Sequence, residues 1–460
     1  MSQTTTTTDT PDHRARALAA AVQGPVLIAG DEGFDAECAN FQTSQPHRPR
    51  LAVGAARPED VRLAVSFAAE HGLTAAVQGT GHGPGRPAEG GVLITTHRMA
   101  RVGIDPHRRT ARIRAGARGG AVARAAAEHG LAPLGGSAPH VGAVGYLLGG
   151  GLPLLGRTFG WAADRVRRLQ VVTAQGRLRT LTPRDEPALV RGLLGGRGAL
   201  AAVTEVETEL VELERLFGGG LYLDAADPAA ALGAYTAWTR DLPPEMNSSA
   251  ALIPVPDAPG VPEAITGRTV MHLRVAYTGP AQRGRDLVRR LEAGPVLMGE
   301  LTDMPACESG SVHGEPDTPV AWFGDTALVR DLPHRALGAL ARAAEPGPGA
   351  PLIAEVRHMG GALAADGQAM VGHRQAAYFT NVLTMPGAEV DPEAARRVRE
   401  TASALAPWSL GRLPTFLPSG PHSTPEVVRS AYPAQDLDLL RRLKAEHDPT
   451  DVFAFGHRLD

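Results

Sequence analysis

Apolar and polar residues follow two different periods in the stretch 50–211. Pro58 and the acidic Glu59 and Asp60 are typical of a first helical turn, and apolar residues then recur at helical spacing. His71-Gly72 should end this helix, because glycine readily adopts the left-handed conformation that follows a last turn. The same hexapeptide, Ala-Ala-Glu-His-Gly-Leu, recurs at 126–131 and predicts the end of a second helix there.

Runs of alternating or β-branched residues separate these helices and predict strands. The runs lie at 74–78, 91–96, 110–115, 169–173, 178–181 and 201–210. Elements this short and this mixed indicate an α+β domain.

Longer runs beyond residue 212 predict a second domain, built on a larger sheet that carries helices. Strands are expected at 270–277, 352–357 and 377–383, and helices at 229–238 and 333–344. A further helix at 435–446 precedes a short apolar stretch, 452–455, which should dock on the rest of the chain.

Composition excludes several classes of protein. The 460 residues carry a formal net charge of -3, without the basic footprint of a nucleic-acid-binding protein. Cys38 and Cys307 are too few for a disulfide framework, and no glycine-rich loop precedes Lys444, the one lysine, so a Walker A motif is absent. Because neither a signal peptide nor a membrane-spanning stretch is visible, we expect a cytoplasmic protein whose residues 1–24 form a disordered tail.

The glycine-rich segment 78–85 directly follows a predicted strand. Its four glycines, at alternate positions from 79 to 85, let the backbone approach a ligand and aim several N–H groups at one point, as in a loop that cradles a pyrophosphate. His82 projects from the middle of this loop. It points either toward a bound cofactor or, if the segment is only a surface turn, into solvent.

Two more glycine-rich stretches favour a bound ligand. In 135–151 apolar residues fill the gaps between glycines, which indicates close backbone approach to a flat or extended ligand. The stretch 195–201 formally fits the dinucleotide fingerprint, but it precedes a strand, whereas that motif must follow one. A Rossmann fold is therefore not expected.

These segments resemble the berberine bridge enzyme-like flavoproteins of the vanillyl-alcohol oxidase, or p-cresol methylhydroxylase (PCMH), superfamily. Residues 78–83 are similar to the family's Arg-Gly-Gly-Gly-His-Ser loop, and 136–151 to its Gly-x-Cys-x-x-Val-Gly-x-x-Gly-x-x-x-Gly-Gly-Gly run. Further similar blocks lie, in the family's order, at 94–99, 160–164, 195–204, 355–362 and 448–453. The number and order of the blocks make the resemblance specific.

The resemblance implies an α+β fold in which a PCMH-type FAD-binding domain of two α/β subdomains is joined to a substrate domain with a larger antiparallel sheet covered by helices. The FAD-binding domain is expected at 25–211 and the substrate domain at 212–410, with 411–460 returning to the FAD domain. In this family the loop histidine bonds the 8α-methyl carbon of the flavin, and His82 holds that position. The implied cofactor is therefore FAD attached covalently through His82.

The resemblance and the glycine-rich loops together give a set of expected FAD-binding residues. They are Gln78, Gly79, Thr80, Gly81, His82, Gly83, Gly136, Ser137, Val141, Gly142, Gly145, Gly149, Gly150, Ala201, Val203 and His457. Within this set, the run at 149–151 is expected to bring the backbone close to the cofactor.

Two departures from the family pattern affect attachment and catalysis. The cysteine that gives many relatives a second covalent link to the flavin corresponds to Ala138, so we expect attachment through His82 alone. The strand that commonly supplies an active-site tyrosine begins here with Leu413, and a leucine neither accepts nor donates a proton.

The candidate catalytic residues are therefore Tyr378, Asn381, His140 and Glu355. Asn381, at the family's catalytic Gln/Glu position, offers hydrogen bonds but no basicity. Tyr378 falls on the opposite face of the same strand and is either a proton acceptor or an ordinary sheet aromatic. Glu355 is either a base or the structural partner of an arginine, and His140, beside the lost cysteine, should lie near the flavin.

The resemblance implies an FAD-dependent oxidase of bacterial secondary metabolism that transfers hydride from a small or medium organic substrate to the flavin, with dioxygen as second substrate. Two alternatives stay open: a flavin-dependent oxygenase or cyclase of the same fold, or a degenerate member with non-redox binding or cyclisation chemistry. No nucleic-acid, membrane or metal partner is expected, and the sequence does not set the oligomeric state.

Overall fold

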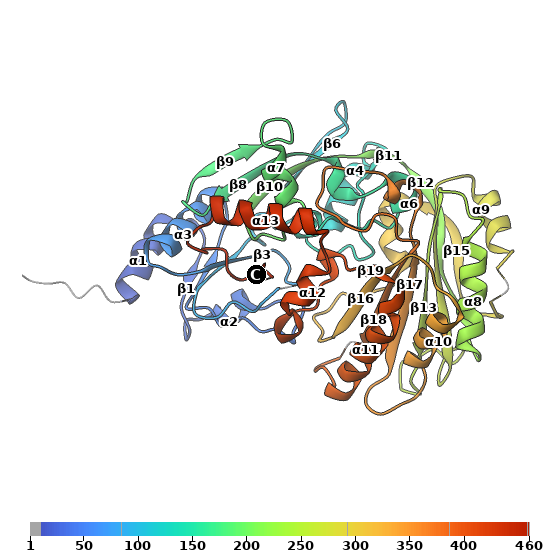
Figure 1. The fold of residues 1–460 in the computed structure, drawn as a ribbon. Helices are drawn as coiled ribbons and strands as arrows, with labels where there is room; N and C mark the ends of the chain where they lie inside the picture. Colours follow the sequence, from blue (N-terminus) through green and yellow to red (C-terminus); the bar gives the residue numbers. More distant parts are fainter. Residues whose placement is uncertain (1–10, 84, 292, 386, 458, 460) are drawn as a thin grey trace, which may run out of the picture.

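The computed structural model describes residues 11–459 except 84, 292, 386 and 458. Besides a two-stranded ribbon formed by β7 (Leu131–Ala132) and β11 (Val211–Glu212), it contains sheets of four, five and eight strands. Figure 1 shows the two smaller sheets, with the N-terminal third of the chain, on one side and the largest sheet with its own helices on the other.

The four-stranded sheet positions the first glycine-rich loop. Its order is β1 (Val26–Leu27), β2 (Leu51–Gly54), β4 (Val92–Thr95) and β3 (Ala75–Gln78). The last three strands are parallel, and α3 (Pro58–Glu70) connects β2 to β3, ending at Gly72 with φ +63° as predicted. Because parallel strands share a carboxyl edge, the loops after β3 and β4 leave the sheet side by side.

The five-stranded sheet is antiparallel and lies beside the first. Its order is β5 (Val102–Asp105), β6 (Thr110–Arg114), β10 (Ala201–Glu209), β8 (Val166–Thr173) and β9 (Leu178–Leu181). Its connections contain α4 (Gly119–Ala127), α5 (Ala143–Leu148), α6 (Gly156–Phe159) and α7 (Pro187–Leu193). The third glycine-rich stretch precedes β10, so it does not have the strand–loop–helix order of a dinucleotide fingerprint.

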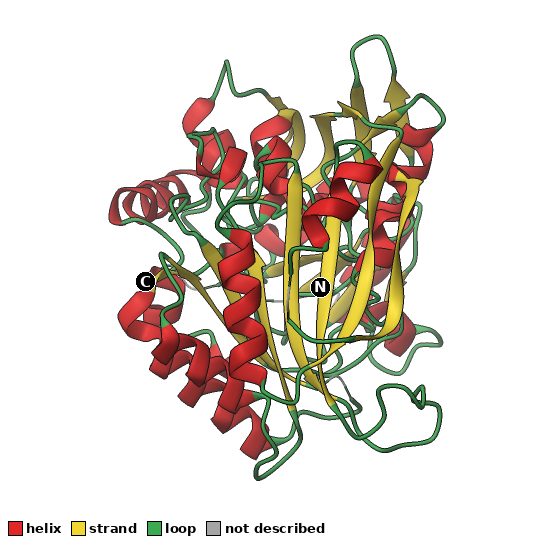
Figure 2. Ribbon diagram, turned by 90° about the vertical axis from the view of Figure 1, so that its right-hand side faces the viewer, coloured by secondary structure: helices red, strands yellow, loops and turns green. Residues whose placement is uncertain are grey.

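The eight-stranded sheet is antiparallel throughout. Its order is β15 (Val296–Pro305), β12 (Arg215–Asp224), β14 (Thr269–Tyr277), β13 (Met246–Pro254), β17 (Leu352–His358), β18 (Tyr378–Thr384), β16 (Gly324–Val329) and β19 (Ser409–Gly411). Helices α8 (Pro228–Thr239), α10 (His334–Ala343) and α11 (Pro392–Leu405) bury one face of the sheet in an apolar core, while α9 (Ala281–Val288) packs near β12 and β15 (Figure 2). The other face is turned toward the smaller sheets.

The C-terminal segment returns to the first part of the chain after β19. Helix α13 (Ala434–His447) packs on α7, where Arg191 binds Asp436 at 2.8 and 2.9 Å, and the shorter α12 (Pro425–Arg429) precedes it. Val452 and Phe453 are buried in the core of the four-stranded sheet. The apolar end of the chain therefore docks as its composition predicted.

The expected tail at 1–24 needs a correction. Residues 1–10 lie outside the described part of the chain, but Pro11–Ala21 form helix α1, which packs against α3. Leu18 and Val22, one helical turn apart, are buried in the core of the first sheet. The prediction of disorder was wrong for this helix because one apolar pair is enough to dock a short helix on an existing core.

Several strands of the large sheet were not predicted. In β12 the run Gly218-Gly219-Gly220 disfavours a strand on propensity alone. A Cβ at Gly218 or Gly219 would collide with the carbonyl oxygens of Val275 or Glu300 on the neighbouring strands. The glycines therefore serve close strand packing, which cannot be recognised before the neighbours are known.

No helix within the described ranges has the length and apolar character needed to cross a bilayer. The cytoplasmic location stays a prediction.

The docking of the C-terminal segment gives a stability prediction. The buried Asp448 carboxylate accepts hydrogen bonds from the N–H groups of Val452 (2.8 Å) and Phe453 (2.9 Å) and pairs with Lys444 Nζ at 2.5 Å. We expect Asp448→Ala to lower the free energy of unfolding by about 3 kcal/mol, since two buried donors and a cation lose their acceptor. Urea denaturation measures this. Asp451→Asn, which changes an exposed partner of Lys444, should cost less than about 1 kcal/mol, and equal losses would contradict the assignment.

Candidate active site

A cavity of about 1030 Å³ lies between the glycine-rich loops and the free face of the eight-stranded sheet. We call the segments 78–83, 135–145 and 197–203 the loop wall, and the cavity-facing residues of β12, β14, β17 and β18 the sheet wall. Parts of the C-terminal segment, 415–419 and 453–457, also line the cavity. A space of this size between two domains is typical of a site for a large organic ligand.

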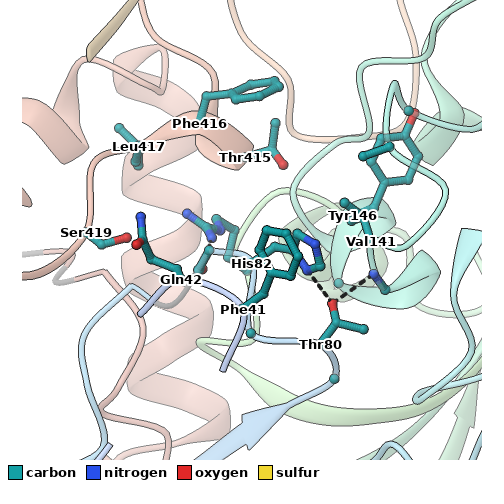
Figure 3. Close-up of a pocket in the computed structure, with 18 of the residues that line it drawn as sticks. Phe41, Gln42, Thr80, His82, Val141, Tyr146, Thr415, Phe416, Leu417 and Ser419 are labelled. Carbon is teal, nitrogen blue, oxygen red and sulfur yellow. Dashed lines mark hydrogen bonds between the residues drawn. The ribbon is translucent and has the colours of Figure 1, made fainter. Parts of the chain in front are cut away.

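The His82 ring is held in one orientation on the loop wall (Figure 3). Its Nδ1 lies 2.8 Å from Thr80 Oγ1, which also accepts a 3.0 Å hydrogen bond from the N–H of Gly142 on the next glycine-rich segment. Its Nε2 is buried without a hydrogen-bond partner in the described part of the chain. Burial, with smaller effects of His140 and Arg118, lowers the pKa of His82 from 6.5 to about 3, so the ring is neutral at pH 7.

Phe41 and His140 complete an aromatic cluster around His82. The Phe41 ring stacks on His82 with a centroid separation of 3.9 Å and an interplanar angle of 11° (Figure 3), and His140 lies 4.9 Å from both rings. Burial lowers the pKa of His140 below its ordinary value, so this imidazole is also neutral at pH 7. Two of the glycine-rich segments thus bring their histidines to one point of the cavity.

Gln78 replaces the arginine with which the family's loop begins, and it anchors the loop. Its Nε2 donates to Ala39 O at 2.9 Å, and its Oε1 lies 2.7 Å from His47 Nε2. His47 Nδ1 accepts a hydrogen bond from Ala88 N–H at 2.8 Å, so the proton is on Nε2 and is donated to Gln78. The loop is therefore tied from both sides and is not a free surface turn.

The loop wall leaves empty space where side chains would stand. A Cβ at Gly135, Gly145 or Gly198 would meet no heavy atom within 4 Å, and all three glycines line the cavity. Bare backbone around a large cavity, with a histidine among the lining residues whose Nε2 is buried and unpartnered in the described part of the chain, fits an extended cofactor such as FAD. Of the expected FAD-binding residues, all but Gly149 and Gly150 line this cavity.

Gly149 and Gly150 were predicted to lie close to the cofactor, and this prediction was wrong, because protein side chains approach them instead. A Cβ at Gly149 would come within 2.7 Å of Thr415 Cβ, and one at Gly150 would collide with Val371 Cγ2. Gly150 has a φ of +96°, which a side chain rarely adopts. The run therefore packs against the returning C-terminal segment and the loop before β18, and not against the cavity.

Arg197 joins the loop wall to the end of the chain. Its Nη1 donates to Pro414 O at 3.0 Å and to His457 Nε2 at 2.6 Å, while Nη2 bonds to Gly83 O. His457 Nδ1 in turn lies 2.5 Å from Ser423 Oγ. Because Arg197 has a φ of +50°, its backbone is strained, and the bonds of its guanidinium hold it in place.

Strand register gathers the polar residues of the sheet wall into two rows. The first row carries Tyr222, His272, Ala251, Glu355, Asn381 and Thr326. The second, two residues further along the strands, carries Arg274, Ser249 and Arg357. Side chains two apart share a face, so both rows are turned to the same side of the sheet.

Glu355 is paired with two arginines. Its Oε1 lies 2.7 Å from Arg274 Nη1 and 3.0 Å from Arg357 Nε, and its side chain is 5% exposed. Burial opposes ionisation of Glu355, but the charges of Arg357 and Arg274 outweigh it and hold the pKa below its ordinary value. Of the two alternatives for Glu355, a base or the structural partner of an arginine, the contacts favour the second. A carboxylate anchored in this way is a poor proton acceptor.

The structure places Tyr378 away from the cavity. Its hydroxyl lies 2.8 Å from Thr239 Oγ1, in the apolar core under α8 and α10, and burial raises its pKa. Asn381, Glu355 and His140 do line the cavity. Tyr378 is therefore the ordinary sheet aromatic of the two alternatives. Leu413, at the family's tyrosine position, is 1% exposed and belongs to the central core.

Sequence reasoning missed several charged or polar residues of the cavity, four of which matter most for its charge and its junction with the end of the chain. They are Arg197, Arg274, Arg357 and His313. For Arg274 a signal was present, because His272 and Arg274 alternate with apolar residues along β14, as polar residues on one face would. His313 follows η2 (Ala306–Val312) and has no comparable pattern around it.

The first part of the chain is similar to known flavoproteins. A family model described as FAD binding domain matches residues 49–182. The (R)-6-hydroxynicotine oxidase of Paenarthrobacter nicotinovorans is 33% identical over 196 residues, 42% of this chain and 43% of that protein. An FAD-dependent monooxygenase of Fusarium proliferatum is 34% identical over 200 residues, 43% of this chain and 38% of that protein. The chain thus matches less than half of the length of either relative.

Solved structures match over nearly the whole chain. The 6-hydroxy-D-nicotine oxidase of Arthrobacter nicotinovorans has a TM-score of 0.79 at 22% identity, covering 95% of this chain and 98% of that one. The xylooligosaccharide oxidase of Myceliophthora thermophila has a TM-score of 0.82 at 20% identity, covering 98% of each. The fold class expected from the sequence is thereby confirmed.

The buried histidines of the cavity predict acid sensitivity. Burial, assisted by Arg274, lowers the pKa of His272 from 6.5 to about 3, so below pH 6.5 the unfolded chain binds a proton that the folded chain does not. Stability should therefore fall as the pH drops from 7 to 5. In His272→Phe this fall should be shallower by about 1.4 kcal/mol per pH unit below pH 6. Chemical denaturation at pH 7, 6 and 5 measures the slope.

The exposed His107 provides the control, because its side chain is not buried on folding. His107→Phe should leave the pH slope unchanged. Equal slopes for the wild type and His272→Phe would contradict a buried neutral imidazole at this position.

Proposed function

Because the chain carries an FAD-binding domain of the PCMH-type superfamily, to which berberine bridge enzyme-like proteins belong, we propose that it is an FAD-dependent oxidoreductase acting on a small or medium organic substrate. The observation that carries the proposal is the buried, unpartnered Nε2 of His82 among bare glycine backbone at the edge of the cavity. The loop wall would hold the cofactor, and the sheet wall would face the substrate.

Covalent attachment through His82 alone forms part of the proposal. Thr80 holds the His82 ring through Nδ1 beside the cavity, Nε2 has no partner in the described part of the chain, and Ala138 offers no thiol for a second link. The glucooligosaccharide oxidase of Acremonium strictum, with a TM-score of 0.80 at 20% identity, is described with a 6-S-cysteinyl, 8α-N1-histidyl FAD. The chain matches 97% of its own length to 98% of that structure.

The bound FAD would supply the hydride acceptor. The residues of the chain would orient the substrate and take up the proton that a hydroxyl or amine loses with the hydride. We assign the proton to an imidazole nitrogen of His140, which is neutral at pH 7 and half-buried at the cavity. Glu355 stays ionised and anchored by its arginines, and Asn381 beside it would donate or accept a substrate hydrogen bond.

Dioxygen is the proposed electron acceptor, as in an oxidase. The family resemblance is also the basis for proposing an enzyme of bacterial secondary metabolism, and the cytoplasmic location stays an expectation from the sequence.

A flavin-dependent oxygenase is the second candidate. Relatives described as FAD-dependent monooxygenases are 32 to 35% identical to parts of this chain, and the absence of a tyrosine at Leu413 favours chemistry without that base. Turnover under ¹⁸O-labelled dioxygen separates the two: label in the organic product supports the oxygenase, and label only in peroxide or water supports the oxidase.

The proposal predicts a yellow protein whose flavin stays bound after denaturation. His82→Ala should abolish in-gel flavin fluorescence, because no other residue is assigned a covalent bond. His140→Ala, which changes the neighbouring histidine, is the matched control and should keep it. Fluorescence that survives in His82→Ala, or flavin released by acid precipitation of the wild type, would refute covalent attachment. Absence of flavin absorbance from the wild type would refute the function itself.

The proton assignment predicts an ordered set of reduction rates. His140→Ala should slow flavin reduction by at least about tenfold, a threshold set below the usual contribution of a general base. Asn381→Ala should mainly raise the substrate dissociation constant. Tyr378→Phe is the control, because the phenol lies outside the cavity, and its rate should stay within about twofold. Stopped-flow reduction measures all three; a full rate in His140→Ala would remove the assigned base.

A further inference from the structure

The sheet wall carries more buried positive than negative charge. Arg274 and Arg357, with side chains 11% and 14% exposed, share the single carboxylate of Glu355. The imidazoles beside them add no charge, because burial lowers the pKa of His272 to about 3 and that of His313 well below its ordinary value. Within the buried cluster two guanidinium charges thus face one carboxylate, and the exposed Glu315 adds a more distant negative charge that acts on both arginines.

Each guanidinium also keeps donors free. Arg274 uses Nη1 on Glu355 and Nε on His272, and Arg357 uses Nε and Nη2 on Glu355. No acceptor in the described part of the chain bonds to Arg274 Nη2 or Arg357 Nη1. Neither atom is among the buried unpartnered ones, so both keep some exposure; the two side chains line the large cavity and a small one of about 30 Å³ beside it.

The surroundings of the pair favour a flat ligand. The Arg357 guanidinium lies 5.7 Å from the ring centroids of Phe379 and Phe416, which hold its plane. His313, 3% exposed, has an Nδ1 that bonds to no described residue and lies 4.0 Å from Glu355 Oε1. Glu315 faces the cluster from an exposed loop and lies 3.6 Å from His313 Nδ1, but it forms no ion pair with either arginine. The cavity thus presents two fixed guanidinium groups, each bonded to Glu355 and each with one Nη atom that bonds to no acceptor in the described part of the chain.

We propose that Arg274 and Arg357 form a carboxylate-binding subsite, so that the substrate of this enzyme is an organic anion. Guanidinium groups bind planar carboxylates through paired, charge-assisted hydrogen bonds, which are the strongest that a protein offers. Glu355 serves here as a positioning residue that holds both forks at the cavity. That the bound anion is a substrate rests on the proposed function. Binding of a carboxylate at the subsite depends only on the residues of the sheet wall.

Calorimetric titration of the purified protein with benzoate, benzamide and benzylammonium tests the subsite. These probes share a ring and differ in charge. Benzoate should bind at least about tenfold more tightly than either of the others, the factor expected for a hydrogen bond to a charged group. Equal affinities, or no measurable binding of benzoate, would overturn the proposal.

Variants separate charge from packing. Arg274→Gln and Arg357→Gln should each weaken benzoate binding by at least about tenfold. Glu355→Gln, which raises the positive charge of the cluster, should strengthen it. Arg215→Gln, which removes an exposed arginine paired with Asp303 at the start of β12, is the matched control and should change nothing. If Glu355→Gln does not fold, the two arginine variants decide alone, and unchanged benzoate binding in both would refute the subsite.

The flavin spectrum of each sample distinguishes the two claims. A colourless protein that binds benzoate through its arginines keeps the subsite and loses the proposed function. A yellow protein without selectivity for benzoate keeps the function and loses the subsite.

Discussion

The pairing of one buried carboxylate with two guanidinium groups on the sheet wall prevents the two halves of the molecule from closing on each other. Desolvation of Arg274, Glu355 and Arg357 against bare glycine backbone would remove water from charges without new partners. The loop wall, for its part, presents bare backbone at its glycines, with apolar side chains such as Val141 and Val203 between them. A cavity persists where these two surfaces meet because neither can gain by covering the other.

Elsewhere along the same boundary the halves are tightly joined. Arg157, on α6, donates its backbone N–H to Asn247 Oδ1 at 2.8 Å and its Nε to Met246 O at 2.9 Å, which links the first part of the chain to β13. The indole of Trp161 donates to Leu363 O at 2.9 Å. These contacts flank the cavity and set the spacing of its walls. Charged and glycine residues line the gap that these contacts leave between the two halves.

Much of this site could be predicted from the sequence, because glycine-rich loops after strands have few uses. His82 and its neighbours in 78–83 were recognised from their local pattern, and the structure brings them to the cavity. The failures have a common physical origin. A glycine run such as 149–151 shows that something approaches the backbone closely, but not whether it is ligand or protein. The alternation of side chains along a strand placed Tyr378 and Asn381 on opposite faces of the sheet. It did not indicate which of the two faces is covered by helices.

The charged residues of the sheet wall were harder to predict for a different reason. Arg274 and Arg357 come from strands that are 83 positions apart in numbering, and they become neighbours only through Ser249, which pairs with both. Considered alone in the sequence, each arginine would be expected to be a solvated side chain. The carboxylate they share was recognised as a candidate, with a structural arginine partner as one alternative. The sequence could not reveal that Glu355 has two arginine partners, so that two guanidinium charges face one carboxylate.

This excess of positive charge bears on the two departures from the family pattern. Ala138 and Leu413 replace a thiol and a phenol with apolar side chains, and Leu413 is fully absorbed into the core. Tyr146, the remaining phenol on the loop wall, donates to Leu134 O at 3.1 Å, and burial raises its pKa well above 10, so it is no proton acceptor at neutral pH. The imidazoles of the loop wall are those of His82 and His140. An anionic group held at the arginines would leave the rest of a substrate to extend from the sheet wall toward these histidines, so recognition by charge and the transfer of a proton would fall to opposite walls of one cavity.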